Sequence, residues 1–298
     1  MKDALKVGIG ALLAATVASS FAACPPAGTT RESLLALKRA EWVVADDAGR
    51  QRLALALLDC LADPDPVLRD DLAFDALAHW MRGRQIAADT LQAIRATLLP
   101  RLDAAESDSA GFRRPFAALA LAEVARADRL QSFLSTEQRA ELVRAGAAYL
   151  TSVRDYRGFD AALGWRHGVA HGADLLLQLA LHPALERAQI DAILAAIASQ
   201  VIAANAHFYV YGEGDRLMAP VFYIGRRAAL SEDEWNAWFL ALTSRRAKPA
   251  AATQASLAAN HDLAAFLLPL YASLRESGDA QMQARILPAV AAALKTLD

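Results

Sequence analysis

Cysteine is nearly absent from this chain of 298 residues, which contains only Cys24 and Cys60. Two cysteines are too few for a disulfide-rich scaffold or for a structural zinc site built from cysteine pairs. Cys60 lies among Leu57, Leu58 and Leu61 in a segment expected to be helical. We therefore interpret it as a buried thiol that packs like a small apolar residue. A disulfide between the two cysteines is the alternative in an oxidising compartment, and their spacing alone does not decide between these states.

Glycine and proline are also scarce, with 15 and 11 residues. Proteins built from β-sheets need more turn residues and more runs of β-branched residues than this sequence offers. Hydrophobic residues make up 55% of the chain, and alanine is an obvious contributor. This composition is typical of many packed helices, so we expect an all-α fold.

The chain lacks an excess of either charge, with 31 Lys and Arg residues against 33 Asp and Glu residues. Neither sign is concentrated in one part of the sequence, which argues against nucleic acid as a partner and against an electrostatic membrane patch. A glycine-rich phosphate loop, a serine elbow and a kinase signature are all missing. The sequence therefore argues against nucleic-acid binding and against the enzyme classes that carry these three motifs, and it does not indicate a particular function.

No apolar run is long enough to span a membrane, because the stretch at residues 7–18 covers about a dozen residues where about 20 are needed. Lys2 and Lys6 flank its start and small residues follow it, so residues 1–23 are predicted to be a secretory signal peptide. An uncleaved first helix is a third, less favoured interpretation. We therefore expect an exported protein, either periplasmic or lipid-anchored to the bacterial envelope.

Two cleavage sites compete at the end of this segment. Small residues before Cys24 resemble the lipobox of bacterial lipoproteins, so we expect lipidation of Cys24, although Phe21 stands where leucine is more usual. Cleavage after Ala22 would instead release a soluble protein whose Cys24 is free. Contact with the membrane is expected only through the lipid.

The rest of the chain reads as a short tether at residues 24–30 and a single helical-repeat domain at residues 31–298. Capping boxes, in which Ser or Thr precedes Glu or Gln by three positions, mark helix starts at Thr29, Ser135 and Ser231. After a first helix, the apolar spacing predicts helices at residues 48–62, 67–82, 88–105, 114–131, 137–152, 164–181, 186–204, 215–229, 232–244, 252–275 and 280–297.

The segment at residues 61–73 reads Leu-Ala-Asp-Pro-Asp-Pro-Val-Leu-Arg-Asp-Asp-Leu-Ala, which is similar to the inter-helix signature of HEAT-like repeats. Its two prolines stop one helix and pre-set the first turn of the next, and its aspartates can cap that helix. We therefore expect HEAT- or armadillo-like stacked helix pairs, arranged as an α-solenoid or a compact α-α superhelix.

Two imidazoles and a carboxylate share one predicted helix face. A helix beginning near Gly164 would place His167, His171 and Asp174 within about 60° of arc. Such a set can hold a metal ion or perform acid–base catalysis, with a histidine as base and Asp174 orienting it. The zinc-peptidase form is excluded because Gly168 stands where that motif has glutamate. A divalent metal is not favoured, and a polar network between helices explains the same residues.

Two unusual connections, at residues 153–163 and 205–214, carry aromatic and charged side chains. Loops of this composition often hold binding residues. The aromatic residues Tyr156, Phe159 and Trp165 are expected to lie in the core, and the alternative is that they line a pocket. The ligand-binding candidates from these loops and the adjoining helix starts are Arg157, Asp160, Trp165, Glu213, Asp215 and Arg216.

Glycines at positions 164, 168 and 172 form a second stripe on the same predicted helix, and each costs a helix interior about 1 kcal/mol relative to alanine. A favourable interaction must offset this loss of helix stability. We favour close packing of a neighbouring helix against the glycines, and a ligand in the vacated space is the alternative.

Four segments together resemble the bacterial domain-of-unknown-function family 2785. They are Pro-Asp-Pro-Val-Leu-Arg-Asp-Asp-Leu-Ala at 64–73, Asp-Tyr-Arg-Gly-Phe at 155–159, Gly-Trp-Arg-His-Gly-Val-Ala-His-Gly-Ala-Asp at 164–174 and Gly-Glu-Gly-Asp-Arg-Leu at 212–217. The resemblance implies an all-helical, HEAT-like domain and brings no activity with it. We expect a ligand- or protein-binding module of the cell envelope. The alternative is a hydrolase or lyase, which could depend on a metal.

Overall fold

The computed structural model describes residues 24–103, 108–246 and 251–297, and within them the chain is almost entirely helical. The α-helices are α1 (Arg31–Arg39), α2 (Asp47–Ala56), α3 (Asp75–Arg82), α4 (Ala88–Leu98), α5 (Arg113–Leu130), α6 (Thr136–Ser152), α7 (Gly168–Ala180), α8 (Arg187–Gln200), α9 (Glu213–Gly225), α10 (Glu232–Ser244), α11 (Gln254–Glu276) and α12 (Ala280–Leu294). The shorter elements are the 3-10 turns η1 (Asp59–Ala62) and η3 (Leu99–Leu102), the π-helical segment η2 (Val67–Phe74), and the strands β1 (Phe159–Asp160) and β2 (Gly164–Trp165).

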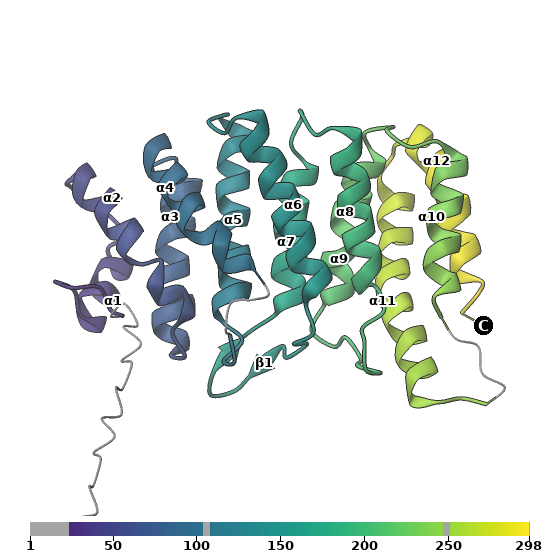
Figure 1. Ribbon diagram of the computed structural model, residues 1–298, viewed down its shortest axis with the longest axis horizontal. Helices are drawn as coiled ribbons and strands as arrows, with labels where there is room; N and C mark the ends of the chain where they lie inside the picture. Colours follow the sequence, from purple (N-terminus) through teal and green to yellow (C-terminus); the bar gives the residue numbers. More distant parts are fainter. Residues whose placement is uncertain (1–23, 104–107, 247–250, 298) are drawn as a thin grey trace, which may run out of the picture.

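The helices stand side by side in a row along the longest axis of the molecule (Figure 1). One layer contains α3, α5, α7, α9 and α11, in which each helix contacts the next. The second layer contains α4, α6 and α8, which pack against α5, α7 and α9. The expected all-α fold of stacked helix pairs is therefore confirmed.

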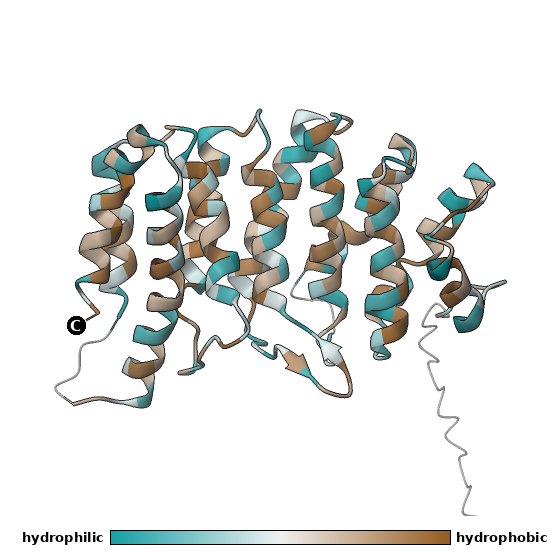
Figure 2. Ribbon diagram, turned by 180° about the vertical axis from the view of Figure 1, so that it is seen from behind, coloured by the Kyte–Doolittle hydropathy of each residue, from teal (hydrophilic) through white to brown (hydrophobic). Residues whose placement is uncertain are grey.

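The core lies between the two layers and continues along the whole row. Hydrophobic and hydrophilic residues are interleaved along the helices, as expected when each helix buries only part of its surface (Figure 2). Large fully buried side chains include Trp80, Phe116, Tyr149, Trp235 and Phe266. Within the described residues, no helix combines the length and the apolar character needed to cross a membrane.

Helix starts follow the local capping chemistry. The capping boxes predicted at Ser135 and Ser231 are confirmed. The box predicted at Thr29 is wrong by one position, because the Thr30 side chain caps α1 and Ser33 completes the box. Asp65 accepts a hydrogen bond from the Val67 backbone amide at 2.9 Å, as expected for the proline-containing turn.

The interpretation of Cys60 as a free thiol is wrong, because Cys24 and Cys60 form a disulfide with their Cα atoms 5.2 Å apart. A sulfur atom in a disulfide has no valence left for a thioether. Lipidation of Cys24 and this disulfide therefore exclude each other in any one molecule. The predicted signal peptide at residues 1–23 lies outside the described residues.

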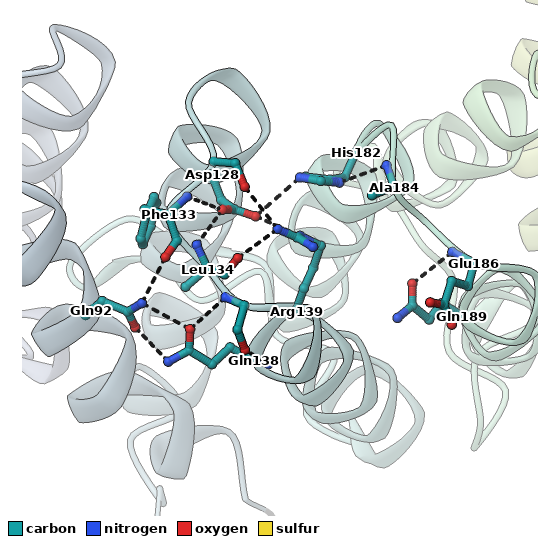
Figure 3. Close-up of polar contacts among 12 residues, drawn as sticks. Gln92, Asp128, Phe133, Leu134, Gln138, Arg139, His182, Ala184, Glu186 and Gln189 are labelled. Carbon is teal, nitrogen blue, oxygen red and sulfur yellow. Dashed lines mark hydrogen bonds and ion pairs between the residues drawn. The ribbon is translucent and has the colours of Figure 1, made fainter.

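A buried polar network joins three consecutive elements at the C-terminal end of α5 (Figure 3). The Asp128 carboxylate accepts hydrogen bonds from the backbone amides of Phe133 and Leu134 and from Arg139 Nε at 2.9 Å. His182 Nδ1 accepts from the Ala184 amide, so the proton sits on Nε2, which lies 3.3 Å from Asp128. The network fixes α5 against α6 and the turn after α7.

Candidate functional site

The segment that carries the predicted His/His/Asp set begins with a hairpin and not with a helix. Strands β1 and β2 pair antiparallel, with Phe159 opposite Trp165. Gly164 has φ +73° and His167 has φ 55°, which places both in the left-handed region. The helix predicted from Gly164 therefore starts at Gly168, and His167 precedes it. The spacing of the histidines resembles that of a continuous helix, which is why the sequence alone misplaced the start.

Gly172 lets α7 approach α6 closely, because a β-carbon there would lie 3.0 Å from the Tyr149 ring. A β-carbon at Gly168 would lie 3.4 Å from the Tyr149 hydroxyl, which is an ordinary contact distance. That hydroxyl donates to the Gly168 carbonyl at 3.1 Å. The predicted packing role is therefore confirmed for Gly172, whereas Gly164 lies in the hairpin turn.

Arg69, from η2, fastens the hairpin to the helical layer. Its guanidinium is fully buried, lies over the Phe112 ring at 3.9 Å and donates to the carbonyl oxygens of Leu163 and Trp165. The Asp70 carboxylate accepts two further hydrogen bonds from it. The hairpin that precedes α7 is therefore tied to the proline-containing repeat signature, about 95 positions earlier in the chain.

A groove of about 380 Å³ is lined by residues of the layer that contains α3, α5, α7 and α9. His171 and Asp174 of α7 and Arg216 of α9 are among these residues. The residues that complete its lining come from η2 and from α3, α5 and α7: Phe74, Arg82, Leu119, Ala122, Glu123 and Gln178. We call this cavity the central groove.

Two ion pairs stand in the central groove. Arg216 donates to Asp174 at 2.5 Å, and Arg82 donates to both carboxylate oxygens of Glu123. Both arginine side chains are about half exposed (51% and 56%), whereas the carboxylates are mostly buried. Burial raises the pKa of Asp174, and Arg216 opposes that shift. The four charges cancel, so the lining is polar but neutral overall.

His171 forms part of the groove wall and is uncharged at neutral pH. Burial, together with the neighbouring His167 and Arg216, lowers its pKa to about 3, and the Pro115 backbone opposes the shift. The ring packs edge-on against Phe116, and its Nδ1 atom is enclosed by protein. The groove therefore meets an uncharged ring at this position.

His167 lies beside the groove and makes different contacts. Its Nε2 atom donates to the Tyr211 carbonyl oxygen at 3.1 Å and lies 3.9 Å from a carboxylate oxygen of Glu213. The two histidine rings are 5.8 Å apart. Burial lowers the pKa of His167, and Glu213 partly restores it. The structure thus brings His167, His171, Asp174, Glu213 and Arg216 into one region.

A metal centre is not assembled there. Across the part of the chain that the structure describes, no three His, Cys, Asp or Glu side chains come together in a way that could hold an ion. For the predicted set the cause is visible, because Arg216 engages Asp174 and the Tyr211 carbonyl engages His167 Nε2. Because α7 starts at Gly168 and not at Gly164, His167 precedes the helix and does not lie on the helix face that carries His171 and Asp174.

The other predicted binding residues lie elsewhere. Arg157 pairs with Asp155 at 2.5 Å. Asp160 accepts hydrogen bonds from the backbone amides of the hairpin turn. Asp215 is exposed. These three residues do not line the central groove.

The expectation that Phe159 and Trp165 belong to the core is wrong. Phe159 is 49% exposed and Trp165 is 38% exposed, because the hairpin projects from the lower edge of the helical row (Figure 1). Arg82 and Glu123 are the charged groove residues that sequence reasoning missed. Glu123 carried a usable signal, since it is a lone acid in the otherwise apolar run at residues 115–125 of α5.

Comparison with known proteins assigns the chain to a family. The model of a family described as "Protein of unknown function (DUF2785)" matches residues 98–271, more than half of the chain. This range holds α5, α7 and α9 but excludes η2 and α3, so Arg82 and the segment at 64–73 lie outside it. No curated protein and no solved structure matches.

Proposed function

The chain belongs to the DUF2785 family, and we propose that it is an exported binding module that takes a small, neutral, polar ligand in the central groove. The observation that carries the proposal is the groove of about 380 Å³, in which two ion pairs and the uncharged His171 ring converge from α3, α5, α7 and α9. Ligand sites commonly occupy cavities of a few hundred Å³ with a few convergent polar groups.

The charge balance of the groove supports a neutral ligand. Arg82 and Arg216 are each already paired with a carboxylate, and His171 adds no charge at neutral pH. A ligand with a net charge would have to break one of these pairs and leave a mostly buried carboxylate without its partner. A ligand that offers hydroxyl or amide groups can hydrogen-bond to the same side chains without that cost.

The disulfide supports export. Cys24–Cys60 is the type of bond that persists in oxidising compartments and is rare where thiols are kept reduced. Attachment to the envelope through a lipid on Cys24 competes with this bond. We therefore propose that the disulfide-bonded form is the soluble one.

The alternative of a hydrolase or lyase has less support. A histidine whose pKa is about 3 is a weak general base at neutral pH, and His167 has its Nε2 proton committed to a carbonyl oxygen. Chemical turnover of a bound ligand, followed by mass spectrometry, would favour the enzyme over the binding module.

The test uses the full mature protein and three classes of neutral probe, namely a polyol (inositol), a disaccharide (maltose) and a blocked dipeptide (N-acetyl-dialanine amide), with succinate and putrescine as charged probes. At least one neutral probe is expected to raise the melting temperature of the wild type but not of Arg216→Ala. Arg187→Ala, which removes an exposed arginine paired with Asp191 and Glu234, is the matched control and should respond like the wild type. Stabilisation by the charged probes alone, or by no probe at all, would refute the proposal.

A further inference from the structure

An exposed group of aromatic rings adjoins the central groove. Trp165 stacks on His167 with ring centroids 4.7 Å apart, and Phe159 and Tyr211 lie 5.0 and 5.7 Å from Trp165. Phe159, Trp165 and Tyr211 are 49%, 38% and 40% exposed. We call Phe159, Trp165, His167 and Tyr211 the aromatic cluster. Exposed aromatic rings gathered in this way are a common mark of an interaction site.

The aromatic cluster is held in place by its surroundings. Gly158 allows the Tyr211 ring to lie against the backbone, since a β-carbon there would come within 2.0 Å of that ring. The buried Arg69 binds the carbonyl oxygens of Leu163 and Trp165. Exposed rings that are fixed in this way lose little conformational entropy when a ligand stacks on them.

The aromatic cluster and the central groove are contiguous. His167 stacks on Trp165 on one side, and its ring centroid lies 5.8 Å from that of His171, which lines the groove. Tyr211 and Arg216 likewise belong to one short segment that leads from the cluster into the groove. A ligand that fills the groove and extends past His171 therefore meets the aromatic rings.

We propose that the ligand is a neutral oligosaccharide, with its first two sugar units in the central groove and the following units over the aromatic cluster. This inference rests on the function proposed above and adds the class of ligand. A sugar offers hydroxyl groups that suit the paired carboxylates, guanidiniums and amide of the groove. Its ring also has faces of weakly positive C–H groups, which stack on the electron-rich faces of aromatic rings.

Other ligand classes match only one half of the site. An inorganic or organic ion finds no net charge to compensate it in the groove. An apolar ligand suits the exposed rings but would leave the two ion pairs of the groove without polar contacts. A neutral oligosaccharide is complementary to both parts.

The experiment measures binding of maltotetraose, cellotetraose and tetra-N-acetylchitotetraose by titration calorimetry and by the change in tryptophan fluorescence. At least one tetrasaccharide is expected to bind the wild type, and Trp165→Ala or Tyr211→Ala should weaken that binding at least tenfold. The corresponding disaccharide, which occupies only the groove, should be affected less than threefold. Leu240→Ala, at an exposed apolar residue of α10, is the control and should bind like the wild type. Circular dichroism verifies that each variant is folded.

The outcomes separate this inference from the proposed function. No saccharide binds in the first outcome, but inositol or the blocked dipeptide stabilises the wild type and not Arg216→Ala. The inference of an oligosaccharide ligand is then wrong, whereas the proposed binding of a small neutral ligand in the central groove is supported. If a tetrasaccharide binds and the aromatic variants bind it equally well, the role of the aromatic cluster is wrong. If a tetrasaccharide binds equally well to Arg216→Ala, both proposals fail.

Discussion

The Nη2 atom of Arg69 donates a hydrogen bond to the carbonyl oxygen of Leu163 at 2.7 Å, and this contact joins η2 to the β1–β2 hairpin 94 positions later in the chain. The guanidinium is fully buried between Phe112 and the hairpin. Burial lowers the pKa of Arg69, whereas the adjacent Asp70 raises it. The position of the aromatic cluster therefore depends on a charge inside the protein.

Replacement of this arginine should be costly. Arg69→Leu leaves Asp70 and the hairpin carbonyl oxygens without their donor, and loss of one partner of a buried charged pair typically lowers the free energy of unfolding by about 3 to 5 kcal/mol. Arg52→Leu, at a guanidinium that is 72% exposed, should cost less than about 1 kcal/mol. Urea denaturation of both variants checks this prediction, and equal losses would contradict it.

Asp128 should stabilise the fold at neutral pH and not in acid. Burial raises the pKa of Asp128, but hydrogen bonds from Arg139, Leu134 and Phe133 outweigh it and leave the pKa below its ordinary value. Such a group contributes stability above its ordinary pKa, and the contribution is lost as the pH falls through the lowered value. Asp128→Asn should therefore cost about 3 kcal/mol at pH 7, and the cost should shrink progressively as the pH falls below the ordinary aspartate pKa of 3.8.

The control for this change is Asp191→Asn, because Asp191 forms an ion pair with the half-exposed Arg187. Its effect at pH 7 should stay below about 1 kcal/mol. Denaturant titrations of both variants across the pH range measure the two differences. A cost for Asp128→Asn that does not change with pH would show that the charge of Asp128 is irrelevant.

His171 should make the protein sensitive to acid. Its pKa is about 3 in the folded chain and near 6.5 in the unfolded chain, so the unfolded chain binds more protons between these values. The free energy of unfolding therefore decreases as the pH falls through this window, by at most about 1.4 kcal/mol per pH unit from this group. His171→Leu should remove that part of the slope.

Nuclear magnetic resonance provides the direct check on His171. The ring signals of its imidazole should not titrate between pH 5 and pH 8 in the wild type. A midpoint near 6.5 would mean that the ring is charged in weakly acidic solution and that the groove is not neutral there.

Two glycines should respond in opposite ways to alanine. A β-carbon at Gly214 of α9 would lie 2.4 Å from the backbone oxygen of Ala265 in α11, so the two helices must separate, and we expect a loss of about 2 to 4 kcal/mol. At Gly168 the nearest atom would be 3.4 Å away. Gly168→Ala should be neutral or should stabilise by up to about 1 kcal/mol through helix propensity. Thermal unfolding of the pair tests this, and a comparable loss in both would contradict it.

The disulfide should stabilise the mature protein. It joins residues 36 positions apart, and the entropy of closing a loop of that length corresponds to about 3 to 4 kcal/mol. Reduction or Cys60→Ser should lower the unfolding free energy by about that amount. Peptide mapping without reductant should recover Cys24 and Cys60 in one linked fragment. A lipid-modified Cys24 beside a free Cys60 thiol would contradict the prediction.

Much of the fold follows from local rules that the sequence displays. Ser135 and Ser231 cap their helices as predicted, because the capping box depends on side chains only three positions apart. The start of α7 was missed because His167 adopts a left-handed conformation that only the packed hairpin can impose. Of the three residues predicted to share one helix face, His171 and Asp174 line the same groove, whereas His167 precedes the helix.

The site itself depends on contacts between distant parts of the chain. Arg82 and Glu123 are 41 positions apart, and their pairing exists only because α3 and α5 are neighbours in one layer. Trp165 was assigned to the core from its residue type, whereas its exposure follows from the projection of the hairpin beyond the helices. Residue type and spacing indicate candidate site residues, but the order in which the helices pack decides which of these residues come into contact.

The central groove takes its two arginines from α3 and α9, which are the first and last helices of four that stand in sequence. Any shift of these helices relative to one another therefore changes the distance between the two guanidinium groups. A ligand that contacted both arginines would favour one arrangement of the layer. Its binding would then be linked to the packing of helices that it does not touch.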